Sequence, residues 1–489
     1  MASVDESYDV VIVGAGISGI NFAYRLQERN PNLTYTVLEN RHEMGGTWSL
    51  FKYPGIRSDS DLYTFGFPWR PWNQENSIAS GESIIKYIKE SAQIYGIDKN
   101  IQYHHNVDHA NWSTDDKAWY LDVTADGSTK KKVRGRFMLM CTGYYNYGEP
   151  LKTTIPGIED FGGKVVHPQF WPEDLDYKDK NVVIVGSGAT AMTLLPNMTD
   201  HASHVTMLQR SPSYLLSQPS EDGMEKFIRR WFPLFMAHRL IRIKWLILPF
   251  IFVNFCHYFP NASRTAIMKA TIPQLPESTP YDPTFKPKYN PFEQRVCFCP
   301  DGDFYQSLRD GKSSVVTGSI ETVTKNSIKL TNGKELHPDI IVTATGLQIR
   351  LAGGMTLKTD NVPYNIPDKY FWKGVMLQDL PNCAFVIGYV DASWTLGADA
   401  TAQLVNRMLS QMEKEGAEEV VPRLSEREKQ SMGQMSVLNL TSTYVQRGAS
   451  MLPKAGDKGQ WRARRFYFQD IWQAWFGDIK TGTEWVRGV

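Results

Sequence analysis

Two glycine-rich loops, each set between a short apolar strand and a helix, constrain the fold of this chain more than any other feature. In the first, DVVIVGAGISGINFAYRLQER, a strand over 9–13 leads into Gly14, Gly16 and Gly19 in the pattern GxGxxG, and then into a helix over 17–29. The first glycine turns the chain, the second lets a pyrophosphate approach the backbone, and the third packs helix on strand. The helix N-terminus faces the phosphates. This loop predicts a Rossmann-type dinucleotide site.

The residue at the end of the next strand indicates which dinucleotide the first loop binds. That strand, TYTVLEN, ends at Glu39, twenty residues beyond Gly19. A carboxylate there can hold ribose hydroxyls. Because an acid repels a 2′-phosphate, the first loop predicts FAD or NAD.

The second loop, NVVIVGSGATAMTLL, carries Gly186, Gly188 and Ala191 as GxGxxA after a strand over 182–185. Its next strand, HVTMLQRSP, ends at Arg210 and Ser211, so an arginine stands where the first loop has an acid. A guanidinium beside a hydroxyl suits a dianionic 2′-phosphate, which predicts NADPH. The alternative is that Arg210 is an ordinary surface arginine at a strand end.

Two such loops predict FAD at the first and NADPH at the second, in an α/β fold of two Rossmann-like domains. Buried strands ending in Thr-Gly, over 136–143 and 339–346, indicate where the chain crosses between domains. We therefore expect a helical insertion within the NADPH domain. The expected boundaries are 1–150 and 347–489 for the FAD domain, 151–220 and 290–346 for the NADPH domain, and 221–289 for the insertion.

The sequence patterns of three further segments predict their secondary structure. The polar stretches 103–127 and 319–339 alternate as β-meanders do, and Asn332-Gly333 marks a tight hairpin turn. The segment 382–409 reads as strand, loop and helix, where a flavin ring can meet a helix N-terminus.

Bulk properties exclude several classes of function. The 489 residues carry a net charge of +1, which gives no general attraction to nucleic acid. Five scattered cysteines without a CxxC pair predict neither a disulfide framework nor a dithiol reductase, and no metal site is expected. The cytoplasm is the expected compartment, because the start MASVDESYDVVIVGAG runs into a strand with no basic region before it.

The most apolar run is WLILPFIFVNFCHYFP, over 245–260. It is shorter than the roughly 20 residues of a spanning helix, and a proline, an asparagine and a histidine interrupt it. We expect a buried helical subdomain here. Contact with a membrane surface through 229–260 is the alternative, because five basic residues precede the run: Arg229, Arg230, Arg239, Arg242 and Lys244.

Two longer motifs resemble those of a known enzyme family. FGGKVVHPQFWP fits FxGxxxHxxxWP, with Phe161, Gly163, His167, Trp171 and Pro172. GGTWSLFKYPGIRSDSD fits GGxWxxxxYPGxxxD, with Gly45, Gly46, Trp48, Tyr53, Pro54, Gly55 and Asp59. With both dinucleotide loops, these motifs resemble the type I Baeyer–Villiger monooxygenases. The runs GYYNYGEP, YNPFEQR and YVDASWTL make the likeness closest to the ethionamide-activating branch. Glu173 departs from the residue that the family often has there.

The resemblance implies an NADPH- and O2-dependent flavin monooxygenase. In that family NADPH reduces FAD, the reduced flavin captures O2 as a C4a-peroxide, and the peroxide converts a ketone to an ester or lactone. Oxygenation of sulfides and thioamides at sulfur is the expected second activity. The alternatives are a flavin N- or S-monooxygenase without ketone oxygenation and, from a different class, a nucleotide-binding redox sensor without turnover. The ketone and the oligomeric state are not predicted.

The resemblance also implies roles for particular residues. The candidate catalytic residues are Arg295, which would stabilise a peroxide anion, Asp59, which would position it, and His167, which would couple cofactor reduction to domain position. Ser18, Thr47, Trp48, Asp59 and Val107 fall at FAD positions. Arg57, Ser58, Gly186, Ser187, Gly188, Ala189, Thr190, Arg210 and Ser211 fall at NADP positions.

Simpler readings remain open for each candidate catalytic residue. Arg295 could form a structural ion pair, and Asp59 could cap a helix. His167 is favoured as a hydrogen-bonded joint between domains over an acid or base. In that reading Gly162 and Gly163 let the chain turn, while His167 and Trp171 anchor the turn.

Overall fold

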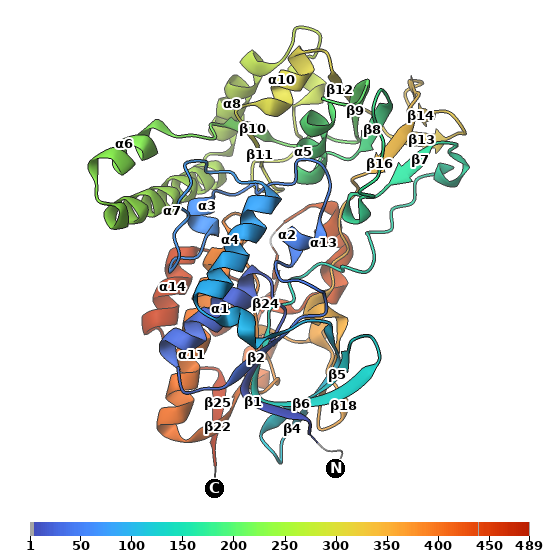
Figure 1. Cartoon of the computed structure of the whole chain (residues 1–489). Coiled ribbons are helices and arrows are strands. Elements are labelled where there is room, and N and C mark those ends of the chain that lie inside the picture. Colours follow the sequence, from blue (N-terminus) through green and yellow to red (C-terminus); the bar gives the residue numbers. More distant parts are fainter. Residues whose placement is uncertain (1–3, 439, 489) are drawn as a thin grey trace.

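The computed structural model describes residues 4–438 and 440–488. Two large β-sheets carry helices against them, and α6 and α7 project at the left of the view in Figure 1. Each glycine-rich loop follows a strand with parallel neighbours on both sides. The predicted α/β fold with two Rossmann-like units is therefore confirmed.

The first sheet has eleven strands. Its central strand β1 pairs in parallel with β2 on one side and β6 on the other, which creates a switch point at the carboxyl end of β1. The strands are β1 (Glu6–Val13), β2 (Tyr35–Leu38), β3 (Ile101–Gln102), β4 (His105–Ser113), β5 (Ala118–Ala125), β6 (Thr129–Met140), β17 (Thr356–Thr359), β18 (Val362–Pro363), β19 (Phe371–Trp372), β20 (Met376–Leu377) and β21 (Cys383–Phe385).

The second sheet has five strands in the order β12-β9-β8-β16-β7, and all its pairings are parallel. These strands are β7 (Lys164–Val166), β8 (Asn181–Val185), β9 (His204–Gln209), β12 (Ser313–Thr317) and β16 (Ile340–Thr343). The strand β16 lies between β7 and β8, so the second Thr-Gly strand ends beside the second glycine-rich loop.

Helices connect and cover the sheets. They are α1 (Ile17–Arg29), α2 (Thr47–Leu50), α3 (Leu62–Phe65), α4 (Gly81–Ile94), α5 (Ala189–Met198), α6 (Gly223–Trp231), α7 (Leu234–Tyr258), α8 (Pro260–Thr271), α9 (Tyr281–Thr284), α10 (Asp303–Arg309), α11 (Trp394–Glu415), α12 (Glu426–Ser431), α13 (Thr443–Gly448) and α14 (Tyr467–Phe476). The predicted helix over 17–29 is α1, and the predicted strand–loop–helix over 382–409 is β21 followed by α11.

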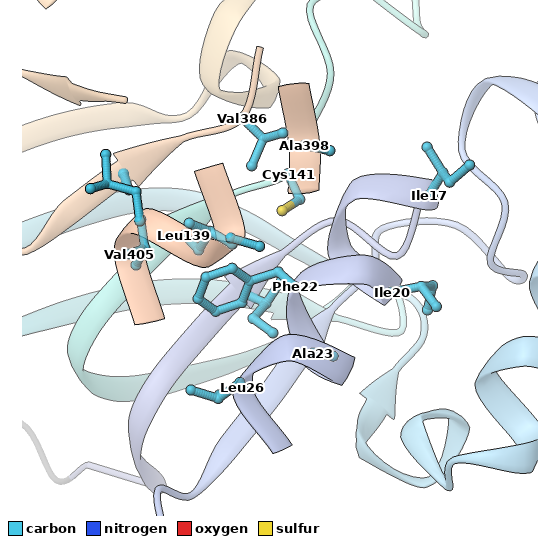
Figure 2. Close-up of a cluster of buried hydrophobic side chains, with 14 of the residues drawn as sticks. Ile17, Ile20, Phe22, Ala23, Leu26, Leu139, Cys141, Val386, Ala398 and Val405 are labelled. Carbon is cyan, nitrogen blue, oxygen red and sulfur yellow. The ribbon is translucent and has the colours of Figure 1, made fainter. Parts of the chain in front are cut away.

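The helices α1 and α11 form the core around the central strands of the first sheet. Figure 2 shows Phe22 of α1, Leu139 of β6 and Val405 of α11 gathered in one cluster, and all three are buried. Arg25 of α1 donates from Nε to Asp399 of α11 at 2.8 Å. Because this ion pair lies within the packed surface between the helices, it fixes their relative position as well as contributing attraction.

Both predicted meanders are confirmed. β4 and β5 are antiparallel, as are β5 and β6. In the second meander β13 (Ile320–Val323), β14 (Ile328–Leu330) and β15 (Glu335–Leu336) form an antiparallel sheet, and Gly333 in the β14–β15 turn has φ of +81°. A positive φ there is what an Asn-Gly hairpin turn requires.

The expectation of a buried helical subdomain is wrong for α7. Only four of its side chains are buried, Ala237, Ile241, Val253 and Cys256. The helix is long and apolar enough to cross a membrane by length and composition, yet 17% of its most apolar 18-residue window is buried. It packs along one side against α3, α6 and α8 and leaves apolar residues exposed on the other. Hydrophobicity predicted burial, but no element covers that side in the described structure.

The chain between the two sheets turns at Gly157, where the backbone conformation and close packing both favour glycine. Gly157 has φ of +73°, and an added Cβ would lie 2.2 Å from the Val323 carbonyl oxygen. Gly127 has φ of +75° and open space around its Cβ position. Gly157→Ala should lower the free energy of unfolding by about 1–3 kcal/mol more than Gly127→Ala, because only Gly157→Ala adds a backbone clash to the same φ strain. Thermal unfolding of both variants measures this, and equal midpoints would contradict it.

Candidate active site

A cavity of about 1280 Å³ opens at the carboxyl ends of β1, β2 and β6. Its lining includes the first glycine-rich loop, the motif segment 45–59, and the first residues of α5 after the second loop. The predicted site residues that line it are Gly14, Gly16, Ser18, Glu39, Thr47, Trp48, Arg57, Ser58, Asp59, Val107, Ala189, Thr190 and Arg295. The first glycine-rich loop and the start of α5, which follows the second loop, therefore line one cavity, at the place where a switch point puts ligands in a parallel sheet.

The three glycines of the first loop are required for different reasons. Gly14 has φ of +104°, and a Cβ there would lie 2.6 Å from the Cys141 carbonyl oxygen. A Cβ on Gly19 would lie 2.0 Å from the Gly14 carbonyl oxygen, so Gly19 allows the helix to pack on the loop. At Gly16 the nearest atom to an added Cβ is 3.7 Å away, in Gly46. Protein packing does not demand the glycine at position 16, and this open cradle fits a pyrophosphate lying against the backbone.

Glu39 is held at the mouth of this loop. Its Oε2 accepts a hydrogen bond from the Ala15 N–H at 2.8 Å, and its Oε1 accepts one from the Arg41 N–H at 2.9 Å. Burial raises the pKa of Glu39, and the two backbone donors oppose that shift. The carboxylate therefore braces the glycine loop as well as facing the cavity.

Side chains from distant segments surround the inner part of the cavity. Trp394, the first residue of α11, donates from Nε1 to the Ser18 hydroxyl at 2.9 Å. Thr47 Oγ1 lies 3.1 Å from the Tyr147 hydroxyl. The α11 N-terminus thus meets the α1 N-terminus beside the cavity, where two helix ends can face a flavin and its phosphates.

In the second loop, as in the first, packing requires one glycine and leaves open space at another. A Cβ on Gly186, which has φ of +142°, would lie 2.2 Å from the Ala344 carbonyl oxygen, whereas nothing lies within 4 Å of the Cβ position at Gly188. Ser187 donates from Oγ to the Ser211 carbonyl oxygen at 3.0 Å, which ties the loop to the end of β9. The open space at Gly188 fits a second pyrophosphate.

Several NADP candidates lie outside the large cavity. Gly186, Ser187, Gly188, Arg210 and Ser211 are absent from its lining, as is Gly19 of the first loop. Arg210 is exposed, and its nearest polar contact is the Thr443 hydroxyl at 3.4 Å. No carboxylate pairs with it in the described residues, so its charge is available to a ligand that reaches the end of β9.

The motif segment 45–59 joins the two sheets. Tyr53 and Phe51 line the cavity and also pack into the hydrophobic core of the second sheet. Arg57 forms a two-point ion pair with Asp303 of α10, one contact being Nη2 to Oδ1 at 3.3 Å. Ser58 is buried, and its Oγ accepts the Ala79 N–H at 3.4 Å. Arg57 is therefore neutralised by the protein, whichever ligand it also faces.

Arg295 and Asp59 lie together on the cavity wall. Arg295 Nε is 3.5 Å from Asp59 Oδ2. The Asp59 carboxylate raises the pKa of Arg295 above its already high value, against the opposing effect of burial, so the guanidinium stays charged. Asp59 is not the cap of the following helix, because Asp61 caps α3 by accepting the Thr64 N–H.

His167 lies away from the cavity lining. Its Nδ1 accepts the Gln169 N–H at 3.2 Å, which caps the short 3-10 turn Pro168–Phe170. Gln169 in turn donates from Nε2 to the Asn146 carbonyl oxygen at 2.7 Å. Burial lowers the pKa of His167, which favours the neutral ring. These contacts link the second sheet's β7 to the segment that follows β6.

A group of aromatic residues beside Arg295 was not predicted individually. Tyr144 and Tyr145 share a hydrogen bond between their hydroxyls at 2.9 Å, and Tyr144 stacks on Trp394 with ring centres 5.3 Å apart. Tyr145 lies 6.5 Å from the ring of Tyr444. Their segments GYYNYGEP and YVDASWTL were noted as family-like, but no spacing rule assigns such tyrosines a role. Only the fold brings 144, 394 and 444 together.

Comparisons with known proteins identify the family. A model of flavin-binding monooxygenase-like proteins matches residues 7–247. The chain is 45% identical over 467 residues to the FAD-containing monooxygenase EthA of Mycobacterium tuberculosis, covering 95% of each chain. It is 41% identical over 468 residues to the probable FAD-binding monooxygenase AlmA of Acinetobacter baylyi, covering 96% of this chain and 93% of that one. The chain belongs to the flavin-binding monooxygenases.

Solved structures share the fold of this flavin monooxygenase. A steroid monooxygenase bound to NADP aligns with a TM-score of 0.74 at 18% identity, over 99% of this chain and 100% of that one. A cyclohexanone monooxygenase from Rhodococcus bound to NADP+ aligns with a TM-score of 0.74 at 16% identity, over the same shares. A complex of OTEMO with FAD and NADP aligns with a TM-score of 0.72, at 17% identity over 98% and 99%. The predicted cofactors, FAD and NADPH, and the predicted resemblance are confirmed.

Because Glu39 accepts a hydrogen bond from the first glycine-rich loop, replacing it should weaken FAD binding. Glu39→Gln should weaken FAD binding roughly tenfold, because an amide oxygen can accept only one of the two backbone N–H bonds comfortably and its NH2 faces the other donor. The flavin-to-protein absorbance ratio after dialysis measures the loss. Glu75→Gln, at an exposed carboxylate, is the matched control and should keep its flavin. Equal retention in both variants would contradict the bracing role.

Proposed function

We propose that this flavin monooxygenase uses NADPH and O2 to convert ketones to esters or lactones, and that it also oxygenates sulfides and thioamides at sulfur. One observation carries the proposal: the Arg295–Asp59 pair lines the cavity that is also lined by the first glycine-rich loop and by Ala189 and Thr190, just after the second. A fixed cation at the place where two cofactors meet is suited to stabilising an oxygen anion.

The chain's own residues divide into two cofactor sites under this proposal. Gly14, Gly16, Ser18, Gly19, Glu39, Thr47, Trp48, Asp59 and Val107 would hold FAD. Arg57, Ser58, Gly186, Ser187, Gly188, Ala189, Thr190, Arg210 and Ser211 would hold NADP. When bound and reduced, the flavin supplies the activation of O2. The FAD domain would comprise 1–150 and 347–489, and the NADPH domain 151–220 and 290–346, with 221–289 inserted.

Arg295 is the proposed catalytic residue. Its guanidinium cannot lose its proton near neutral pH, so it can stabilise a negatively charged oxygen both before and during attack on a carbonyl carbon. Asp59 is a positioning residue, because its contact is with Arg295 Nε and leaves the other guanidinium nitrogens free to face the cavity. The tyrosines 144 and 145 close one side of this region and help to exclude water.

His167 is proposed as a joint rather than an acid or base. It lies outside the cavity lining, and its ring accepts a hydrogen bond from its own turn. Through Gln169 this turn contacts Asn146, so a change in the relation of the two sheets would act on it directly.

The similar structures include a cyclohexanone monooxygenase and a steroid monooxygenase, which supports ketones as substrates. The alternative is an N- or S-monooxygenase without ketone oxygenation. Its signature would be sulfoxide or N-oxide as the sole product when ketones are also supplied. The proposed partners are a small ketone or sulfide and O2, without nucleic acid, and the proposed compartment is the cytoplasm.

Replacing Arg295 separates oxygen transfer from cofactor reduction. Arg295→Ala should leave flavin reduction by NADPH in place and lower ester formation by about 10²–10³-fold, the usual cost of one donor that stabilises an oxyanion. Stopped-flow flavin absorbance and product mass spectrometry measure the two steps. Arg350→Ala is the matched control, because Arg350 lines the same cavity and the described structure gives it no carboxylate partner. Persistent ester formation in Arg295→Ala would refute the assignment.

The proposed 2′-phosphate contact predicts a change in coenzyme preference. Arg210→Ala should raise the KM for NADPH by roughly 10- to 100-fold, as expected for the loss of a charged hydrogen bond, with a much smaller effect on NADH. Steady-state oxidation of the two coenzymes by the same preparation measures this. Because NADH lacks the 2′-phosphate, it serves as the internal control, and equal effects on both would count against the contact.

A further inference from the structure

Three helices expose apolar stripes that no described element covers. On α7, Ile243, Ile247 and Ile251 recur every four residues and are 49%, 42% and 55% exposed. On α6 the exposed apolar side chains include Phe227 and Trp231, four apart. On α14 they include Trp472 and Phe476, also four apart. Because side chains three or four apart share one helix face, each helix presents a continuous apolar stripe.

These stripes belong to adjoining helices, and we call them the apolar face, defined by Phe227, Trp231, Ile247, Ile251, Trp472 and Phe476. α6 is tied to α7 by ion pairs from Lys244 to Asp222 at 2.6 Å and to Glu225 at 3.2 Å. The ring of Phe250 on α7 lies 5.3 Å from that of Phe468 on α14. In Figure 1, α6, α7 and α14 lie along the same side of the molecule.

The unpaired charge along α6 and α7 is positive. The sequence of α7 contains no aspartate or glutamate. Arg230, Arg239 and Arg465 are exposed beside the face, and none has a carboxylate within 4.0 Å in the described parts of the chain. Glu225 of α6 and the preceding Glu221 and Asp222 are already paired with lysines. The surroundings therefore favour an apolar partner with an anionic boundary.

One side of α7 packs against the protein, so α7 is not a membrane-spanning helix. Arg242, within α7, donates from Nη1 to the carbonyl oxygens of Tyr63 at 2.6 Å and Gly66 at 3.0 Å. Ile241 and Val253 are buried on the side of α7 that faces the protein. Because these contacts hold one side of α7 against the protein, the helix can contact a bilayer only along its exposed side.

We propose that the apolar face rests on the surface of an anionic phospholipid bilayer, with its isoleucines and aromatic rings among the acyl chains and its arginines at the headgroups. Tryptophan and arginine both suit this boundary, because each has an apolar body and a polar end. Pairing with a second copy fits less well. A two-fold interface would set this face against itself and bring its unpaired arginines toward a surface of the same charge.

The test is flotation of the FAD-loaded protein with vesicles of phosphatidylcholine, with and without phosphatidylglycerol. The parent protein should float with the vesicles that contain phosphatidylglycerol. The variant Ile247→Glu/Ile251→Glu should bind them at least about tenfold more weakly, because it removes apolar area and adds negative charge. The control Ile94→Glu/Val362→Glu makes the same charge change at side chains that are 60% and 66% exposed elsewhere, and should bind as the parent does.

Two further variants keep the result interpretable. Trp472→Ser/Phe476→Ser should also weaken binding while retaining FAD, which covers the case in which the α7 variant does not fold. Arg230→Gln/Arg239→Gln should reduce the preference for phosphatidylglycerol and its sensitivity to salt. This inference does not depend on which substrate is oxygenated, and NADPH oxidation should be unchanged in all these variants.

Three outcomes would overturn the proposal. The parent could fail to float with anionic vesicles, or the α7 variant and its control could lose binding equally. The third is that sedimentation velocity shows the parent self-associating through the apolar face, with the α7 variant monomeric and no vesicle binding by either. That result would assign the face to an interface between copies of the chain.

Discussion

The arrangement of the cavity depends on one interaction, the packing of Tyr53 into the hydrophobic core of the second sheet. The motif segment begins at Gly45, its Gly46 lies against Gly16 of the first glycine-rich loop, and it places Tyr53 in the core of the second sheet. Its ring loses contact with water, and burial raises the pKa of its hydroxyl. The ion pair between Arg57 and Asp303 then closes the same segment on α10. This segment, held at both ends, brings the first glycine-rich loop and the start of α5 to one cavity.

Each charged side chain that lines the cavity has a hydrogen-bond or ion-pair partner within the protein. Glu39 is buried but accepts two backbone hydrogen bonds, so its cost of burial is offset locally. Asp59 and Arg295 pair at 3.5 Å, which keeps a cation on the wall without leaving it uncompensated. Arg57, for which the family resemblance implies a position beside NADP, forms an ion pair with Asp303. Arg295, the proposed catalytic cation, is thus a different residue from Arg57, whose charge is paired within the fold.

Regular patterns were sufficient to predict much of this molecule. The helix over 17–29, the meanders, the Asn-Gly turn and the two parallel units all follow from local signals, because period, turn residues and glycine spacing act over a few residues. The burial of α7 was predicted wrongly for a physical reason. The α7 sequence is apolar on nearly every side of the helix. It therefore has no amphipathic pattern that would indicate which side packs against the protein. The aromatic group around Tyr144 had no local signal at all.

The sequence by itself determined the two nucleotide loops, the acid at Glu39 and the arginine at Arg210, because each loop needs its glycines within a few residues of its strand and helix. The tertiary structure alone decided that Asp61 rather than Asp59 caps α3 and that α7 keeps its apolar side exposed, and it brings Asp59 to Arg295, a pairing that only the family resemblance implied. The pairing of Asp59 with Arg295 joins residues that are far apart along the chain, and the exposure of α7 depends on which elements pack against it. They depend on how the sheets and helices pack, and local sequence preference does not encode which distant surface will be adjacent.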